Sequence, residues 1–279
     1  MGLFSLLLLV IIYFSFISLG LPDSILGSAW PSMYRSLNVP LTYVGFISVT
    51  ISGGTVISSI FSAKIIRRFG TGAVTAFSVV MTAAALTGFS YAGAFWALCL
   101  LAVPLGLGGG SVDAALNNYV ALHYKAKHMN WLHCFWGVGA SLGPIIMSHF
   151  LMNEHSWKPG YRSIGVIQFC LAAALFVSLP LWKNKSAQKP VKHIPVNFGQ
   201  LLRINGVKQA LTAFFCYCAV ESVIGLWGSS YLVIVKNIAT ETAAKWIAVY
   251  YAGITSGRFI SGFITMKLSN RQMILLGEL

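Results

Sequence analysis

Residues 51–68 read ISGGTVISSIFSAKIIRR, and residues 254–271 repeat the pattern as ITSGRFISGFITMKLSNR, at an offset of 203 positions. Glycine, isoleucine and serine recur in register, and each stretch ends with a lysine and an arginine at matched positions. A shorter match pairs GSAW at 27–30 with GSSY at 228–231. We interpret these matches as a parallel internal repeat of membrane helices. Chance recurrence of glycine and serine is the alternative.

The chain around this repeat is apolar enough to cross a membrane several times. Hydrophobic residues make up 57% and charged residues 9% of its 279 positions, and the mean hydropathy is +0.75. A hydrocarbon core about 30 Å thick needs about 20 apolar residues per helix. We expect an all-α multi-pass membrane protein without a soluble domain, its first segment being retained rather than cleaved. Eight segments qualify: approximately 4–31, 43–63, 73–91, 95–122, 131–151, 163–182, 209–235 and 246–266.

A long polar break divides these segments six to two. Residues 183–208, KNKSAQKPVKHIPVNFGQLLRINGVK, carry six basic residues and two prolines, which is typical of a cytoplasmic linker. We therefore predict a complete six-helix bundle over 1–182 and the first two helices of a second bundle over 209–279. Two equal halves would contain twelve helices, so we expect a chain truncated by about four helices.

The net charge of +13 is distributed unevenly along the chain. If the segments alternate across a membrane, one side carries thirteen lysines and arginines and the other carries five. Such an excess marks the cytoplasmic side of membrane proteins. We therefore predict a cytoplasmic amino terminus, and the positive charge requires no nucleic-acid partner.

The sequence offers no nucleotide, metal or nucleophile signature. The glycine-rich stretch 106–110 lies inside an apolar segment with no strand before it, unlike a phosphate-binding loop. All five cysteines fall in apolar segments, and the pair Cys216 and Cys218 lacks companions at metal-ligand spacing. We expect a protein that is not an enzyme and that carries no cofactor.

Three of the six acidic residues, Asp23, Asp113 and Glu221, lie inside predicted spans. A carboxylate at the centre of a membrane helix costs about 2.5–3.5 kcal/mol on insertion scales, so such residues usually face a water-filled cavity. Pro22 removes a backbone donor immediately before Asp23, which is tolerated where a helix lines a cavity or a neighbour satisfies the freed carbonyl. Trp30 shares a helical face with Asp23 and is a candidate substrate contact.

A second group of polar side chains lies at the end of the fourth span and the start of the fifth. Asp113 and Asn117 are four residues apart and share a helical face, with Asn118 beside them. His133 and Trp136 follow on the next helix. A carboxylate, amides, an imidazole and an indole suit a sugar, whose hydroxyls need hydrogen bonds and whose ring can lie on an aromatic plane. A purely structural polar network is the alternative.

The seventh and eighth spans contain one acid and one base that can form an ion pair. Arg258 lies in a predicted span, where a guanidinium needs a partner, and Glu221 is the nearest candidate in the sequence. We therefore predict an ion pair, either structural or acting as a gate between the two halves.

Six spans, a basic linker and a parallel repeat resemble the major facilitator superfamily. Within it, the fourth and fifth spans resemble the fucose–galactose–glucose:proton symporter branch through Asp113, Ala115, Asn117, Tyr119, Val120, Asn130, His133 and Phe135. That branch carries one acid in span one and another in span four, both tied to proton-coupled sugar transport. The resemblance therefore implies that Asp23 and Asp113 carry the coupling proton.

We accordingly expect a monomeric proton-coupled symporter of a sugar or similar small polar solute, surrounded by lipid in a plasma membrane, such as a bacterial inner membrane. Sodium remains open as the coupling ion. The segment 139–144, GASLGP, resembles a motif associated with antiporters, which keeps drug:proton antiport as an alternative. An inactive remnant and a non-transporting membrane sensor are the others.

Overall fold

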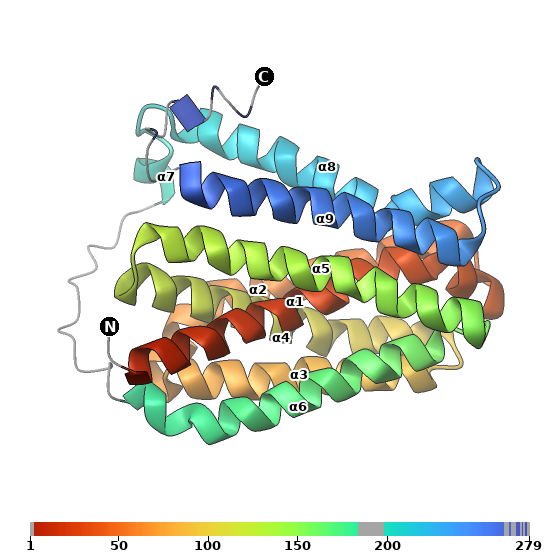
Figure 1. Ribbon diagram of the computed structural model, residues 1–279, viewed down its shortest axis with the longest axis horizontal. Helices are drawn as coiled ribbons and strands as arrows, with labels where there is room; N and C mark the ends of the chain where they lie inside the picture. The colour runs from red at the N-terminus through yellow and green to blue at the C-terminus, as the bar shows by residue number, and fades with distance from the viewer. Residues whose placement is uncertain are drawn as a thin grey trace.

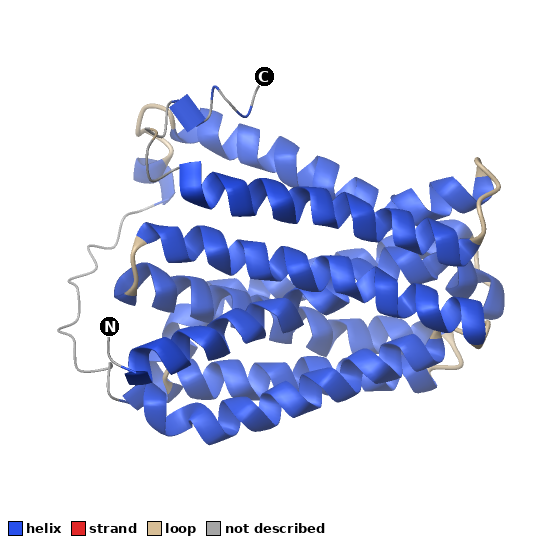
Figure 2. Cartoon of the chain, in the orientation of Figure 1, coloured by secondary structure: helices blue, strands red, loops and turns tan. Residues whose placement is uncertain are grey.

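The computed structural model describes residues 3–183, 198–264, 268, 272–273, 275 and 277. Within these residues the chain is helical and contains no strand (Figure 2). Eight long helices run back and forth along one direction, and short connections join the first six in sequence and the last two to each other (Figure 1). They are α1 (Leu3–Ser36), α2 (Val44–Phe69), α3 (Thr71–Tyr91), α4 (Phe95–His123), α5 (Ala126–Asn153), α6 (Lys158–Lys183), α8 (Val207–Ile234) and α9 (Thr240–Ile264). Two short elements, η1 (Leu41–Tyr43) and α7 (Phe198–Leu201), complete the set.

The eight long helices confirm the eight predicted segments, and most extend beyond the predicted limits. The first helix, for example, continues through Pro31 to Ser36 instead of ending near residue 31. A proline removes only one backbone donor, and neighbouring helices can support a membrane helix around such a gap. The short helix α7 lies inside the predicted linker, while residues 184–197 of that linker lie outside the described residues.

Seven of the long helices are long and apolar enough to cross a membrane, and α9 is not among these seven. Its tyrosines, small polar residues and Arg258 lower its hydropathy. It nevertheless runs along α5, with contacts at Gly137, near the middle of α5, and at Ser148, near its end (Figure 1). Helix α9 therefore belongs to the same bundle as the other seven.

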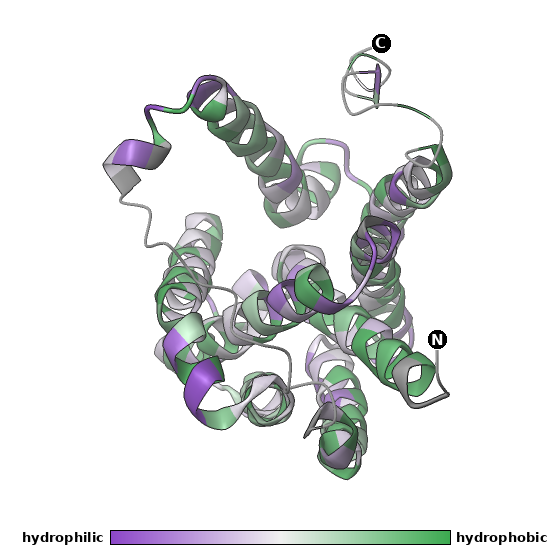
Figure 3. Ribbon diagram, turned by 90° about the vertical axis from the view of Figure 1, so that its left-hand side faces the viewer, coloured by the Kyte–Doolittle hydropathy of each residue, from purple (hydrophilic) through white to green (hydrophobic). Residues whose placement is uncertain are grey.

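Basic residues of several connections lie at one end of this bundle. Figure 3 views the molecule from the end that carries the amino terminus, where hydrophilic colour concentrates in connecting segments. The basic pair Arg67 and Arg68 closes α2, and Lys125 and Lys127 stand where α4 passes into α5. Helices that alternate in direction bring these connections to the same end, as the charge count required.

Glycines allow α1 and α5 to pack with their backbones in contact. A Cβ added at Gly139 would collide with the carbonyl oxygen of Ile17, and one added at Gly20 would collide with that of Trp136. Small residues at such crossings let membrane helices approach closely. This close approach brings the middle of α5 next to the middle of α1.

We expect Gly139→Leu to destabilise the protein by at least about 1–3 kcal/mol, the usual cost of overpacking a tight interior. The collision is with backbone, which cannot move aside as a side chain can. Thermal unfolding of the purified protein in detergent measures the effect. Gly53→Leu is the matched control, because a Cβ at Gly53 meets no atom within 4 Å. Equal melting temperatures for the two variants would contradict this account of the α1–α5 contact.

The internal repeat and the domain boundaries remain predictions. The repeat pairs α2 with α9, but Lys267 and Arg271 lie outside the described residues. The paired glycines also differ in their surroundings. A Cβ at Gly54 would crowd the backbone of Gly106 in α4, whereas one at Gly257 would meet nothing within 4 Å.

Candidate functional site: a cavity between the helices

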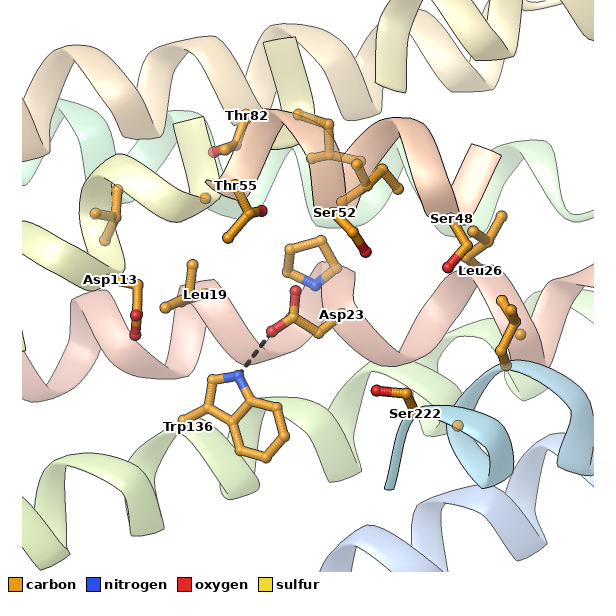
Figure 4. A pocket seen from close by; sticks show the side chains of 18 of the residues that line it. Leu19, Asp23, Leu26, Ser48, Ser52, Thr55, Thr82, Asp113, Trp136 and Ser222 are labelled. Carbon is orange, nitrogen blue, oxygen red and sulfur yellow. Dashed lines mark hydrogen bonds between the residues drawn. The ribbon is translucent and has the colours of Figure 1, made fainter. Parts of the chain in front are cut away.

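A cavity of about 470 Å³ lies between the first six helices and the pair α8 and α9. Each of the eight long helices contributes at least one residue to its wall. Figure 4 labels ten of the lining residues. Apolar side chains form much of this wall. The polar residues among the described lining are the three acids Asp23, Asp113 and Glu221, together with Ser18, Ser48, Ser52, Thr55, Thr82, Trp136, Gln168, Cys218, Ser222 and Tyr251.

The three intramembrane acids meet at this cavity although they come from α1, α4 and α8. The described residues that line it include no lysine, arginine or histidine. Like charges brought together disfavour one another's ionisation, and they attract protons or other cations. The arrangement can therefore hold a proton or another cation.

The Asp23 carboxylate is held by an indole from α5. Trp136 Nε1 donates a hydrogen bond to Asp23 Oδ2 at 2.7 Å (Figure 4). This contact depends on the close approach of α1 and α5, since Gly20 lies directly against the backbone of Trp136. Both side chains line the cavity, as the sequence predicted.

Asp113 also lines the cavity, and its partner comes from its own helix. Asn117 Nδ2 donates to Asp113 Oδ1 at 2.9 Å, which confirms that these residues share a face. Asn117 itself does not line the cavity, and its Oδ1 is buried without a hydrogen-bond partner. Asn118 is exposed on the outside of α4 and also lies away from the cavity. In this structure Asn117 acts on the cavity through Asp113.

His133 is likewise absent from the cavity wall. Its ring meets Phe16 edge-on, with 5.8 Å between the ring centroids. The expectation that His133 points into the central cavity together with Asp113 and Trp136 is therefore wrong for this conformation. Residues 133 and 136 lie almost one helical turn apart, so a small rotation of α5 decides which of them faces the cavity.

Trp30 requires a similar correction. Its side chain is fully buried in the hydrophobic core, and its Nε1 donates to the carbonyl oxygen of Leu41 at 2.8 Å. A side chain with its only donor bound to the backbone has no polar group left for a solute. The structure places Trp30 among the core residues that support α1, outside the cavity.

The predicted pair of Glu221 and Arg258 is present. Arg258 Nη2 lies 3.5 Å from Glu221 Oε2 and 2.7 Å from the hydroxyl of Tyr217. The guanidinium also stands over the ring of Trp136, 4.8 Å from its centroid. A cation on an indole face is attracted by the ring quadrupole. Asp23, Trp136, Arg258 and Glu221 thus form a continuous chain of contacts from α1 through α5 and α9 to α8.

Two groups of lining residues escaped the sequence reasoning. Ser48, Ser52 and Thr55 place a row of hydroxyls from α2 on the cavity wall (Figure 4). Their spacing of four and three residues was a readable signal of one helical face. Gln168 is a single amide in an apolar helix, and nothing in its spacing indicates which neighbour it meets.

The helices α1 and α8 meet at the end of the bundle opposite the amino terminus. A Cβ added at Gly27 would collide with the carbonyl oxygen of Gly225, and Ser229 Oγ donates to the carbonyl oxygen of Ser28 at 3.4 Å. In the first half of α8, Phe214 and Phe215 are exposed. The described contacts of Gly27 and Ser28 with α8 therefore lie at the end opposite the amino terminus.

Comparison with known proteins gives the family. The sequence model of the Major Facilitator Superfamily matches residues 12–279. Among solved structures, that of a D-xylose-proton symporter superimposes with a TM-score of 0.67 at 11% sequence identity, covering 93% of this chain and 68% of that one. This likeness shows the fold.

Curated relatives share between a fifth and a quarter of their residues with the chain. Bypass of stop codon protein 6 of Saccharomyces cerevisiae is 24% identical, with 90% of this chain and 56% of the relative covered. The glucose/mannose transporter GlcP of Bacillus subtilis is 20% identical, with 94% and 67% covered. The cis,cis-muconate transport protein of Acinetobacter baylyi is 21% identical, with 95% and 68% covered.

The chain thus spans about half to two thirds of the length of these relatives. The family match extends over nearly all of the sequence, and the helical bundle agrees with it. The chain belongs to the major facilitator superfamily.

Proposed function

We propose that this protein is a proton-coupled symporter of a neutral polyhydroxy solute, with a sugar as its substrate class. The observation that carries the proposal is the convergence of Asp23, Asp113 and Glu221 on one cavity whose described lining contains no base. Carboxylates in a membrane can take up and release protons. The hydroxyls of α2 and the indole of Trp136 suit a solute with many hydroxyls and an apolar ring face.

In the proposed cycle, an acid of the cavity takes up a proton and the solute binds between the halves. The halves then rock about this site and open it to the other side of the membrane. Release of solute and proton there resets the carrier. We place the protein in the plasma membrane as a monomer with a cytoplasmic amino terminus, and within the fucose–galactose–glucose:proton symporter branch.

The relatives whose names state a solute point to different substrate classes for this chain. The charge of the cavity favours one of these classes. A glucose/mannose transporter and a D-xylose-proton symporter carry neutral sugars by their names, whereas cis,cis-muconate is a dicarboxylate. Arg258 offsets the charge of Glu221, but the described partners of Asp23 and Asp113 are the neutral groups of Trp136 and Asn117. A dicarboxylate would therefore meet two acids without a basic partner among the described contacts, where like charges repel. We therefore favour the neutral solute.

A second candidate is proton-coupled export of an amphipathic organic cation. The same three acids would attract the cation, and Trp136 and Tyr251 add aromatic faces to the cavity. Aromatic faces bind organic cations through their ring quadrupoles. The two candidates differ in whether substrate and proton move in the same direction.

Transport by the complete transporter, purified into liposomes, separates these functions. We expect labelled hexoses or pentoses to accumulate when the interior is made alkaline, and a protonophore to abolish this accumulation. Accumulation of labelled tetraphenylphosphonium against an opposite pH gradient would replace symport with cation antiport. Uptake of muconate but of no sugar would refute both, because it requires an anion to enter the acidic cavity.

A further inference from the structure

Helix α1 contains a break in its hydrogen-bond ladder just before Asp23. Pro22 lies inside α1 and has no backbone N–H, so the carbonyl four residues earlier, that of Ser18, loses its helical partner. Within a membrane there is no bulk water to satisfy such a carbonyl, and leaving it unpaired is costly. The Ser18 carbonyl therefore needs a donor from another helix.

The amide of Gln168, on α6, supplies that donor. Gln168 Nε2 donates to the Ser18 carbonyl oxygen at 2.5 Å, and the Gln168 side chain is 1% exposed. The amide oxygen accepts from Ser18 Oγ at 3.1 Å and from Thr82 Oγ1 at 3.4 Å. One buried side chain thus replaces the bond that Pro22 removes, and it also ties α1 to α3 and α6.

This clamp is placed where it can control the proposed coupling acid. Asp23 follows Pro22 directly, and its carboxylate accepts the indole hydrogen bond of Trp136 from the other side of α1. Ser18, Gln168 and Asp23 all line the same cavity. The direction in which Asp23 points depends on the path of α1 through this turn.

We infer that Gln168 is a positioning residue for Asp23, because it holds the Ser18 carbonyl that Pro22 leaves free and so aims the Asp23 carboxylate at Trp136 and the cavity. This inference rests on the proposed function, because Gln168 affects transport only if Asp23 takes part in coupling. The structural relation between Gln168 and Asp23 can be measured without any solute. A failure of the clamp and a failure of the proposed transport are therefore distinguishable.

The simplest competing account is that Gln168 only fills space among α1, α3 and α6. The two accounts predict different results when a second substitution is added to a variant that lacks the amide. Gln168→Met keeps the length and volume of the side chain but has no N–H to donate. Pro22→Ala returns a backbone N–H to the position that normally serves the Ser18 carbonyl. Pro22→Ala would therefore reverse the effect of the missing hydrogen bond in Gln168→Met, but it would not reverse a packing defect. Combining the two substitutions is thus a double-mutant test.

The readout is the hydrogen bond between Trp136 and Asp23, followed by magnetic resonance of the full chain in nanodiscs with isotope-labelled indole nitrogens. Trp136→Phe identifies the Trp136 signal among the eight tryptophans. We expect Gln168→Met to move this signal to the position of an unbonded indole, and Pro22→Ala combined with Gln168→Met to return it to the parent position. Pro22→Ala alone should leave it in place. Ser178→Ala is the matched control, a buried polar residue of the same helix with bonds away from Asp23.

The inference is overturned if Gln168→Met leaves the Trp136 signal unchanged, or if the double variant does not restore it. Should Gln168→Met alone fail to fold, the comparison moves to folded yield. The double variant should then recover monodisperse protein with the parent Trp136 signal, and the absence of recovery would refute the clamp. The expected shifts of the Trp136 signal together with absent sugar uptake by the parent protein would instead count against the proposed function and leave the clamp standing.

Discussion

Asp113→Asn, made in the complete transporter, is expected to abolish uphill solute uptake driven by a pH gradient while leaving the exchange of labelled for unlabelled solute intact. An asparagine keeps the shape of the side chain and the oxygen that accepts from Asn117, but it cannot take up or release a proton. Exchange does not require the carrier to return empty and deprotonated. Accumulation should therefore stop at equal concentrations inside and outside, as measured in liposomes with and without an imposed gradient.

The control for this experiment is Glu154→Gln, which removes an exposed acid that does not line the cavity. It should accumulate solute as the parent does. Loss of both uphill uptake and exchange in Asp113→Asn would indicate a role in binding or structure. Full uphill uptake would exclude Asp113 as the coupling site and make Asp23→Asn the decisive variant.

Gly27→Leu is expected to reduce transport turnover by at least about a hundredfold. Its side chain would collide with the backbone of Gly225, so α1 and α8 could no longer meet at the end opposite the amino terminus. Overpacking of a tight contact costs about 1–3 kcal/mol, and more against backbone. Because about 1.4 kcal/mol shifts an equilibrium tenfold, about 3 kcal/mol lowers the population of the conformation in which this end is closed by about a hundredfold. A cycle that must pass through that state slows accordingly.

Access to the cavity tests this prediction independently of transport. A cysteine placed by Ser48→Cys, in a background without the native cysteines, lines the cavity on α2. Adding Gly27→Leu should make it react with a membrane-impermeant maleimide from the side that α1 and α8 otherwise close. Gly45→Leu is the control, since a Cβ there meets nothing within 4 Å. Unchanged labelling together with parent turnover would show that this contact is not a gate.

The sequence predicted the helices well because a membrane imposes one simple requirement on each of them. About 20 apolar residues are needed per crossing, and this can be counted locally. The helix ends were less certain, as Pro31 illustrates, because helix continuation past a proline depends on neighbouring helices. The count included the segment 246–266, although α9 is not among the seven described helices that are long and apolar enough to cross a membrane, and its place against α5 is a property of the packed bundle.

In the candidate site, the sequence located the acids, which are rare in membrane helices, but it misplaced two residues of other types. An acid in a membrane helix is costly wherever it lies, so Asp23, Asp113 and Glu221 were recognisable and all three reached one cavity. Trp30 and His133 are of residue types that also belong in cores and helix contacts. Their spacing placed them on a plausible face, but the rotation of each helix decides whether that face meets the cavity or another helix.

The sequence by itself therefore determined the membrane class, the number of long helices, their alternation and the three acids that must leave the lipid. These follow from transfer free energies of single segments and single side chains, which depend little on the rest of the molecule. The tertiary structure alone decided that Trp136 binds Asp23, that Arg258 stands over the ring of Trp136, and that Gln168 serves the carbonyl freed by Pro22. Each of these contacts joins helices far apart in the chain, and the close approach of α1 and α5 at their glycines is set by backbone packing, which no local pattern encodes.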